Sequence, residues 1–150
     1  MNNKCQNVFI EQVYDLQYNF INMDNNTKWI SCFNSKIEEF MTDLISSYPN
    51  DKDFLMFKQS FKMLKLVDDT KPAVLFKMYT MKYIDQITSK DEKFFLDHDF
   101  KDELNSSDNQ DFSSEMLSKL KSYWSTMSSE NKEAIWNYLN LLCKIILKIQ

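Results

Sequence analysis

The chain has 150 residues and a mass of 18.0 kDa, and its 18 Lys against 22 Asp and Glu give a formal net charge of −4. Hydrophobic residues make up 43% of the chain and aromatic residues 15%. These values describe one globular domain over residues 1–150, which can bury about two thirds of its unfolded surface. They exclude a strongly basic nucleic-acid binder, a collagen-like chain and a disordered tail.

Glycine is absent from the sequence. Walker-type and Rossmann-type nucleotide sites therefore lack their defining residue, and tight β-hairpins lose their usual turns. A helical bundle tolerates the absence of glycine, because Asn can close helix ends. Arg is also absent, so no bidentate fork is available for carboxylate or phosphate. The scarcity of residues with GC-rich codons indicates an AT-rich genome.

Apolar residues recur every three or four positions along most of the chain, a spacing that predicts helices. The first helix is expected to run to about Ile21. The second is expected to follow an N-cap at Thr27 and to end before Pro49. A third should begin after a cap at Asp51 or Asp53.

The second half of the chain shows the same spacing. Residues 68–72 read as a turn with an N1 proline, followed by a helix to about Ile87. Ser89-x-x-Glu92 matches a capping box that opens a short helical turn. Residues 104–112 are expected to form a flexible loop, and residues 113–150 a helical hairpin. The Ser128–Ser129 turn joins its two helices and is expected to cap the last one. The sequence thus predicts an all-α fold, a single compact bundle of about six or seven helices.

Charge divides the middle of the chain into a basic and an acidic stretch. The stretch from Phe54 to Ile84 contains six Lys and two Asp, a net charge of +4. The stretch from Asp85 to Glu115 contains ten acidic residues and three Lys, a net charge of −7. The candidate basic face is Lys58, Lys62 and Lys65, which share one side of a helix between apolar residues. The candidate interaction surface is Asp91, Asp97, His98, Asp99, Asp102 and Glu103.

No motif for catalysis or metal binding is found. His98 is the only histidine, and the three cysteines are widely spaced without a CxxC pair. Asp97-x-Asp99 fails as a calcium loop, because Asp102 stands where a glycine is needed. We therefore expect no enzyme activity, no cofactor and no metal. Residues 1–7 lack a long apolar run, so no secretion signal is expected, and the longest apolar stretch is too short for a membrane span.

Two stretches of the chain carry a resemblance to a known family. The first is Lys71–Phe76 with Tyr83–Ile87 and Lys90–Leu96, and the second is Leu120–Trp124 with Glu130–Leu139 and Leu141–Leu142. Together they resemble small helical proteins of uncertain role in nucleocytoplasmic large (giant) DNA viruses of the mimivirus and phycodnavirus kind. The similarity covers about residues 55–149. It implies a viral origin, which agrees with the composition, and it implies no catalytic residue.

The matching residues make sense as packing. Phe94, Phe95 and Leu96 are expected to plug one end of the bundle. An aromatic layer between the last two helices is expected from Tyr123, Trp124, Trp136 and Tyr138.

The function expected from these observations is that of a non-enzymatic viral protein acting through protein–protein contacts, as a virion component or an infection-stage adaptor in the host-cell cytoplasm. Its partner would be a viral or host protein, or a second copy of the chain. One alternative is a groove-type mimic of host apoptosis regulators, although the Gly-Arg element of that groove is missing. The other is association with nucleic acid through the Lys-rich helix face.

Overall fold

The structure is a computed structural model of the chain, and it describes Tyr14, Gln17 and residues 24–100 and 113–150. The described residues form α-helices and one 3-10 helix, with no strand, so the all-α prediction is confirmed. The helix expected to end near Ile21 and the loop expected over residues 104–112 lie outside the described residues. The helices are α2 (Asn25–Ser47), α3 (Lys52–Val67), α4 (Lys71–Thr80), η1 (Met81–Tyr83), α5 (Ile84–Thr88), α6 (Glu92–Asp97), α8 (Ser113–Trp124) and α9 (Ser129–Ile146).

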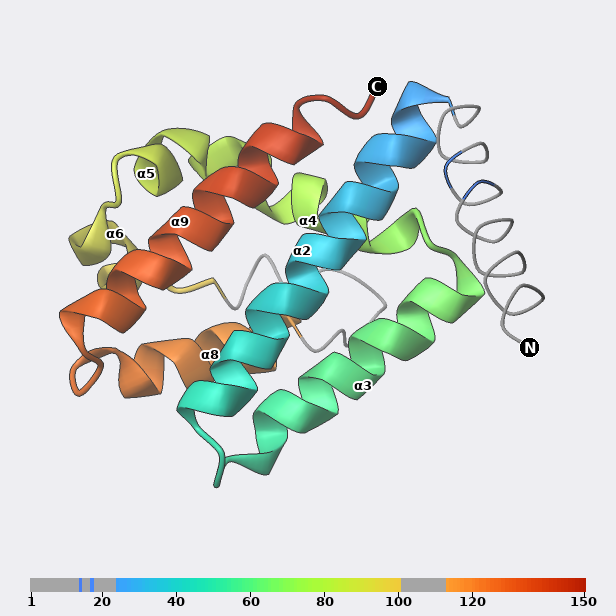
Figure 1. Cartoon of the computed structure of the whole chain (residues 1–150). Helices are drawn as coiled ribbons and strands as arrows, with labels where there is room; N and C mark the ends of the chain where they lie inside the picture. Colours follow the sequence, from blue (N-terminus) through green and yellow to red (C-terminus); the bar gives the residue numbers. More distant parts are fainter. Residues whose placement is uncertain (1–13, 15–16, 18–23, 101–112) are drawn as a thin grey trace, which may run out of the picture.

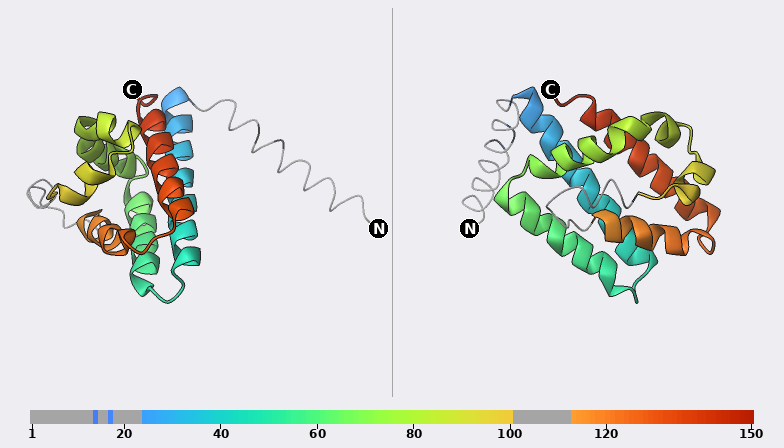
Figure 2. Two further views of the ribbon diagram at one scale, coloured as in Figure 1. Left: turned by 90° about the vertical axis from the view of Figure 1, so that its left-hand side faces the viewer. Right: turned by 180° about the vertical axis from the view of Figure 1, so that it is seen from behind.

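The two longest helices, α2 and α9, lie antiparallel and side by side (Figure 1). At one end, Asn26 Nδ2 donates to the Gln150 carbonyl oxygen over 3.0 Å, and the Gln150 N–H donates back to Asn26 Oδ1 over 2.9 Å. Helix α3 returns along α2, while α4–α6 and α8 lie behind the α2–α9 layer (Figure 2). Residues about 124 positions apart in sequence therefore meet, and the pairing closes the bundle.

Side-chain caps fix most helix starts, and two predicted caps were wrong. Asp24, three residues before Thr27, caps α2 by accepting from the Thr27 N–H over 3.0 Å. Asp91 rather than Ser89 caps α6, because its carboxylate accepts from the Phe94 N–H over 2.9 Å. The predicted caps at Asp51 and Ser128 are confirmed for α3 and α9. In both cases an Asp near the expected position, and not the predicted Thr or Ser, accepts the hydrogen bond from the first turn of the helix.

The helix predicted to run to Ile87 is interrupted at η1, where the chain tightens before α5. Helix α5 ends in a Schellman motif: the Asp91 N–H donates to the Gln86 carbonyl over 2.9 Å and the Lys90 N–H to the Ile87 carbonyl over 3.1 Å. Lys90 has a φ of 55°, a left-handed value that favours glycine. In this glycine-free chain, a lysine thus closes the helix end.

The core consists of two clusters. A tryptophan cluster joins α2, α3, α8 and α9 and contains Phe40, Leu44, Phe54, Phe57, Leu120, Trp124, Met127, Ile135 and Trp136. A C-terminal cluster contains Phe33, Ala73, Leu142, Ile145 and Ile146. Between them lies an apolar cavity of about 210 Å³, lined by Phe33 and Leu142 from one cluster and Phe40 and Leu120 from the other.

The aromatic layer predicted between the last two helices forms only in part. The Trp124 and Trp136 rings meet edge to face at 5.7 Å, and Phe95 packs on both, as the predicted plug requires. Leu96, by contrast, is exposed. Tyr123 turns toward Tyr48 and Tyr138 toward Phe40. Helix α9 packs more extensively on α2 than on its sequence neighbour α8, so the Tyr138 ring meets α2.

Candidate interaction surface

Helix α3 is apolar on two opposite sides. Its inward side buries Phe54, Phe57 and Phe61, which repeat at helical spacing and face α2 and the core. The outward side carries large apolar side chains as well, and Val67 is 82% exposed. A surface helix of a globular protein usually has one apolar stripe facing the core and polar residues opposite. The outward side of α3 is therefore an apolar surface without a cover among the described residues.

The exposed apolar residues of the molecule gather on this part of the fold. Of eleven exposed large hydrophobic residues in the described ranges, seven belong to α3 and α4. We call them the α3–α4 face: Leu55, Met56, Met63, Leu66, Val67, Val74 and Met78. Sequence reasoning missed this face, because it followed one stripe in each helix. The signal was a second apolar series in residues 55–67, out of phase with the phenylalanines.

The α3–α4 face is bordered by positive charge. Lys52 and Lys62 on α3 and Lys77 on α4 are exposed, and none of them forms an ion pair with another described residue. Asp53, which lies on the same helix, is held by Lys119 of α8 at 2.6 Å. The face is therefore apolar at its centre and has at its edge three lysines without ion pairs to other described residues, with the exposed Asp68 and Asp69 following Val67 at the end of α3.

The predicted basic face is largely turned toward α2. Lys58 donates to Thr42 Oγ1 over 2.8 Å, and Lys65 forms an ion pair with Glu38. The Lys62 side chain is exposed, whereas Lys58 and Lys65 are half-buried. The shared side of Lys58, Lys62 and Lys65 thus serves to attach α3 to α2, and it leaves one lysine directed to solvent.

The predicted acidic surface is only partly described, because Asp102 and Glu103 lie outside the described residues. Asp91, Asp97 and Asp99 are exposed. Asp91 is engaged as the cap of α6, and Asp97 is the last residue of that helix. The structure therefore assigns a structural role to Asp91 and leaves Asp97 and Asp99 on the surface.

His98 is half-buried in an aromatic cluster. Its Nε2 lies 3.0 Å from the Tyr83 hydroxyl, and its ring stacks on Phe94 at 4.9 Å and meets the Phe100 ring edge to face at 4.5 Å. The His98 carbonyl accepts a hydrogen bond from Lys121 Nζ over 2.6 Å. These contacts anchor the chain after α6 to η1 and α8.

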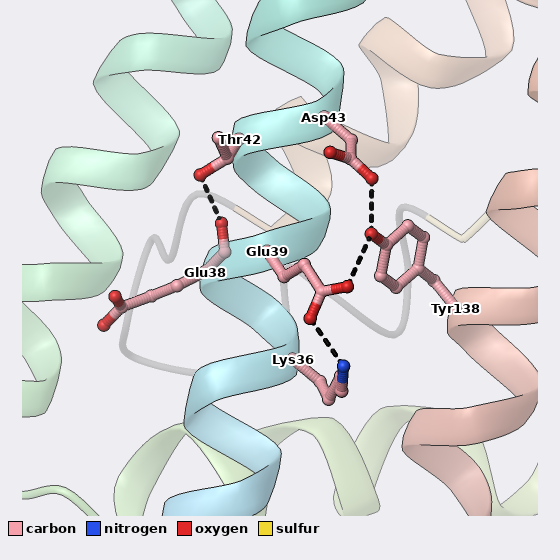
Figure 3. Close-up of polar contacts among 6 residues, drawn as sticks. All are labelled: Lys36, Glu38, Glu39, Thr42, Asp43 and Tyr138. Carbon is pink, nitrogen blue, oxygen red and sulfur yellow. Dashed lines mark hydrogen bonds and ion pairs between the residues drawn. The ribbon is translucent and has the colours of Figure 1, made fainter.

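Figure 3 shows the polar contacts at the α2–α9 seam. Tyr138 of α9 donates to Asp43 of α2 and lies 3.4 Å from Glu39 Oε1, while Lys36 approaches Glu39 at 2.5 Å. The hydrogen bond from Lys36 lowers the pKa of Glu39. Burial, followed by the hydrogen bond to Asp43, raises the pKa of Tyr138 above its ordinary value of 10.0. The raised pKa keeps the Tyr138 phenol neutral, so it retains the proton that it donates to a carboxylate of α2. This hydrogen bond attaches α9 to α2.

A second tyrosine–carboxylate pair joins α8 to the start of α3. Tyr123 donates to Asp51 Oδ2 over 2.6 Å, and Lys119 contacts the same carboxylate at 3.0 Å. The hydrogen bond from Tyr123, helped by Lys119, lowers the pKa of Asp51, the residue that caps α3. The capping carboxylate is thereby kept ionised and fixed in place.

The described residues offer little for metal or thiol chemistry. Among them, no group of three or more His, Cys, Asp or Glu side chains is placed to hold a metal ion. Cys143 is buried in α9, and burial raises the pKa of its thiol to about 11, which disfavours the reactive thiolate. Within the described ranges, no helix has the length and apolar character needed to cross a bilayer.

Comparison of the chain with protein-family models, with curated proteins and with solved structures finds no match in any of the three.

Proposed function

We propose that the chain is a non-enzymatic viral interaction protein, and that its α3–α4 face binds an acidic amphipathic helix of a viral or host partner in the virion or the infected-cell cytoplasm. The observation that carries the proposal is the two-sided apolar character of α3. Its outward side is exposed although its side chains have the chemistry of an interface.

The spacing on the outward side of α3 favours a helical partner. Met56, Gln59, Met63 and Leu66 follow one another at intervals of three, four and three residues. This is the spacing of the seam along which two helices pack in a coiled coil. Methionine is also common at binding surfaces that adapt to a partner, because its side chain is flexible and polarisable.

Charge favours an acidic partner over a second copy of the chain. Lys52, Lys62 and Lys77 border the α3–α4 face. A second copy of the chain in face-to-face contact would bring these like charges together. A partner helix with Glu or Asp beside its own apolar stripe would pair with them. An anionic membrane is less well matched, because no aromatic residue is among the seven exposed apolar residues of the face, and interfacial helices usually carry them.

A direct test uses a fluorescent synthetic helix with Leu at the seam positions and Glu at the flanking positions. A second peptide of the same length carries Lys at those flanking positions. We expect saturable binding of the acidic peptide in fluorescence anisotropy, weakened by added salt, and binding of the basic peptide at least about tenfold weaker. The double variant Met63→Gln with Val67→Gln should weaken the acidic peptide by about tenfold or more, since each side chain buries an apolar surface worth roughly 1 kcal/mol.

The matched control is the double variant Leu141→Gln on α9 with Leu147→Gln at the C-cap of that helix, because both side chains are also exposed. It should leave peptide binding unchanged. The proposal is contradicted if both double variants weaken binding equally, if neither peptide binds, or if the protein binds only vesicles of anionic phospholipid. A stable dimer in light scattering that is dissociated by the Met63 and Val67 changes would also contradict it, because the face would then be covered by a second copy.

A further inference from the structure

A second cavity, of about 140 Å³, lies beside the central one, under α5 and α6. Six aromatic side chains line it: Tyr79, Tyr83, Phe94, Phe95, Phe100 and Trp136. The two cavities share four lining residues, Tyr79, Thr80, Leu117 and Leu139, and so adjoin. A cavity of about 150 Å³ with apolar walls is large enough to bind benzene.

One polar atom in this aromatic surrounding has no partner. Gln86 lines the cavity, and its Oε1 is buried without a hydrogen-bond partner among the described residues. A buried acceptor left unpaired is costly, so most such groups in folded proteins are satisfied by protein or by a bound molecule. The Gln86 backbone carbonyl is already used, since it accepts from the Asp91 N–H at the Schellman motif.

Lysines lie against the rings of the same cluster. Lys121 Nζ lies 4.9 Å from the centre of the Phe100 ring and 5.7 Å from that of Phe95, and Lys82 Nζ lies 5.1 Å from that of Tyr83. These ammonium groups already use the attraction of the rings for a cation. Asp91, which also lines the cavity, is engaged as the cap of α6, and the nearby ammonium groups would repel a cationic ligand, so a neutral ligand fits better.

We infer that this cavity binds a small, neutral, planar aromatic molecule that donates one hydrogen bond to Gln86 Oε1. The rings of the cavity wall supply stacking and edge-to-face contacts, and the amide oxygen selects a molecule with an N–H or O–H group. This site is separate from the α3–α4 face, because none of the seven residues of that face lines the cavity.

The test compares indole with benzofuran, which has the same shape but an oxygen in place of the N–H group. Titration calorimetry on the whole protein should show saturable binding of indole. Benzofuran should bind about tenfold more weakly, because it leaves the Gln86 oxygen unpaired. Choline, a cationic probe for aromatic cages, should not bind.

Two variants and one control locate the site. Gln86→Leu removes the unpaired acceptor, so indole and benzofuran should then bind about equally. The same change at an exposed glutamine outside both proposed sites, Gln150→Leu, keeps the backbone hydrogen bonds to Asn26 and should preserve the preference for indole. Leu117→Trp fills the space shared by the two cavities and should abolish binding of both probes. The inference is overturned if the wild-type protein binds neither probe, if it binds both equally, or if choline binds in their place.

Discussion

Replacement of Tyr138 by Phe tests the polar seam between α2 and α9. The phenylalanine keeps the ring contact with Phe40 at 4.9 Å but loses the hydrogen bond to Asp43 and the 3.4 Å approach to Glu39. A hydrogen bond to a charged group contributes roughly 1.5–3 kcal/mol when well shielded, and the exposure of both carboxylates reduces this to about 1 kcal/mol. We therefore expect the Tyr138→Phe variant to unfold about 2–4 °C below the wild-type protein at neutral pH.

The effect of this substitution should depend on pH. The pKa of Tyr138 is raised in the folded protein by burial and by the hydrogen bond to Asp43, whereas in the unfolded chain the phenol titrates near pH 10. The contribution of Tyr138 to stability is fully present below pH 10 and is lost as the pH rises toward the folded pKa. The difference in unfolding free energy between wild type and variant should thus narrow above pH 10.

Urea unfolding at pH 7 and above pH 10 measures both effects. The control is Tyr48→Phe, because the Tyr48 ring stacks on Tyr123 at 4.4 Å while its hydroxyl has no hydrogen bond to another described residue. This variant should change stability by less than about 0.5 kcal/mol. Equal losses in the two variants, or a wild-type advantage that grows above pH 10, would refute the reasoning about the seam.

Three further substitutions test the helix ends and the core. The first is Lys90→Gly, made in a Glu133→Gln background so that the ion pair of Lys90 is already absent. It should raise the unfolding free energy by about 1 kcal/mol, because glycine adopts positive φ without strain. Chemical denaturation measures this free energy. Leu142→Ala, at a side chain with 0% exposure beside the central cavity, should lower the unfolding free energy by about 2–5 kcal/mol in the same assay. Asp51→Asn should make the unfolding free energy fall less steeply at acid pH. The pKa of Asp51 is lowered in the folded protein, so its contribution to stability is present above its ordinary pKa of 3.8 and is lost as the pH falls through the folded pKa. An unchanged dependence of the unfolding free energy on acid pH in urea titrations would contradict this.

Helix content and most helix ends could be predicted from the sequence. Spacing of apolar residues and the absence of glycine pointed to the all-α fold, and Ser128 was identified correctly as a cap. Errors arose where several residues competed for one role, as with Asp24 and Thr27 at the start of α2. The break at residues 81–83 carries no proline or glycine, so no local signal marked it.

Tertiary partners were less predictable. Tyr138 contacts α2 rather than α8, since helix order in space decides which of its neighbours an aromatic side chain meets. The second apolar series of α3 is visible in the sequence, but whether Met63 is buried or exposed depends on which helices cover α3. The cavity beside Gln86 also arises from three-dimensional packing of α5, α6 and α9, and nothing in the local sequence distinguishes that glutamine.

The most direct test of the proposed interaction surface is methyl NMR of the protein with isotope-labelled methionines, titrated with the acidic helical peptide. Met56, Met63 and Met78 are exposed on the α3–α4 face, whereas Met41 and Met127 are buried in the bundle. We predict that the methyl signals of Met56 and Met63 shift and saturate while those of Met41 and Met127 stay in place. Saturable binding that leaves Met56 and Met63 unshifted would contradict the account.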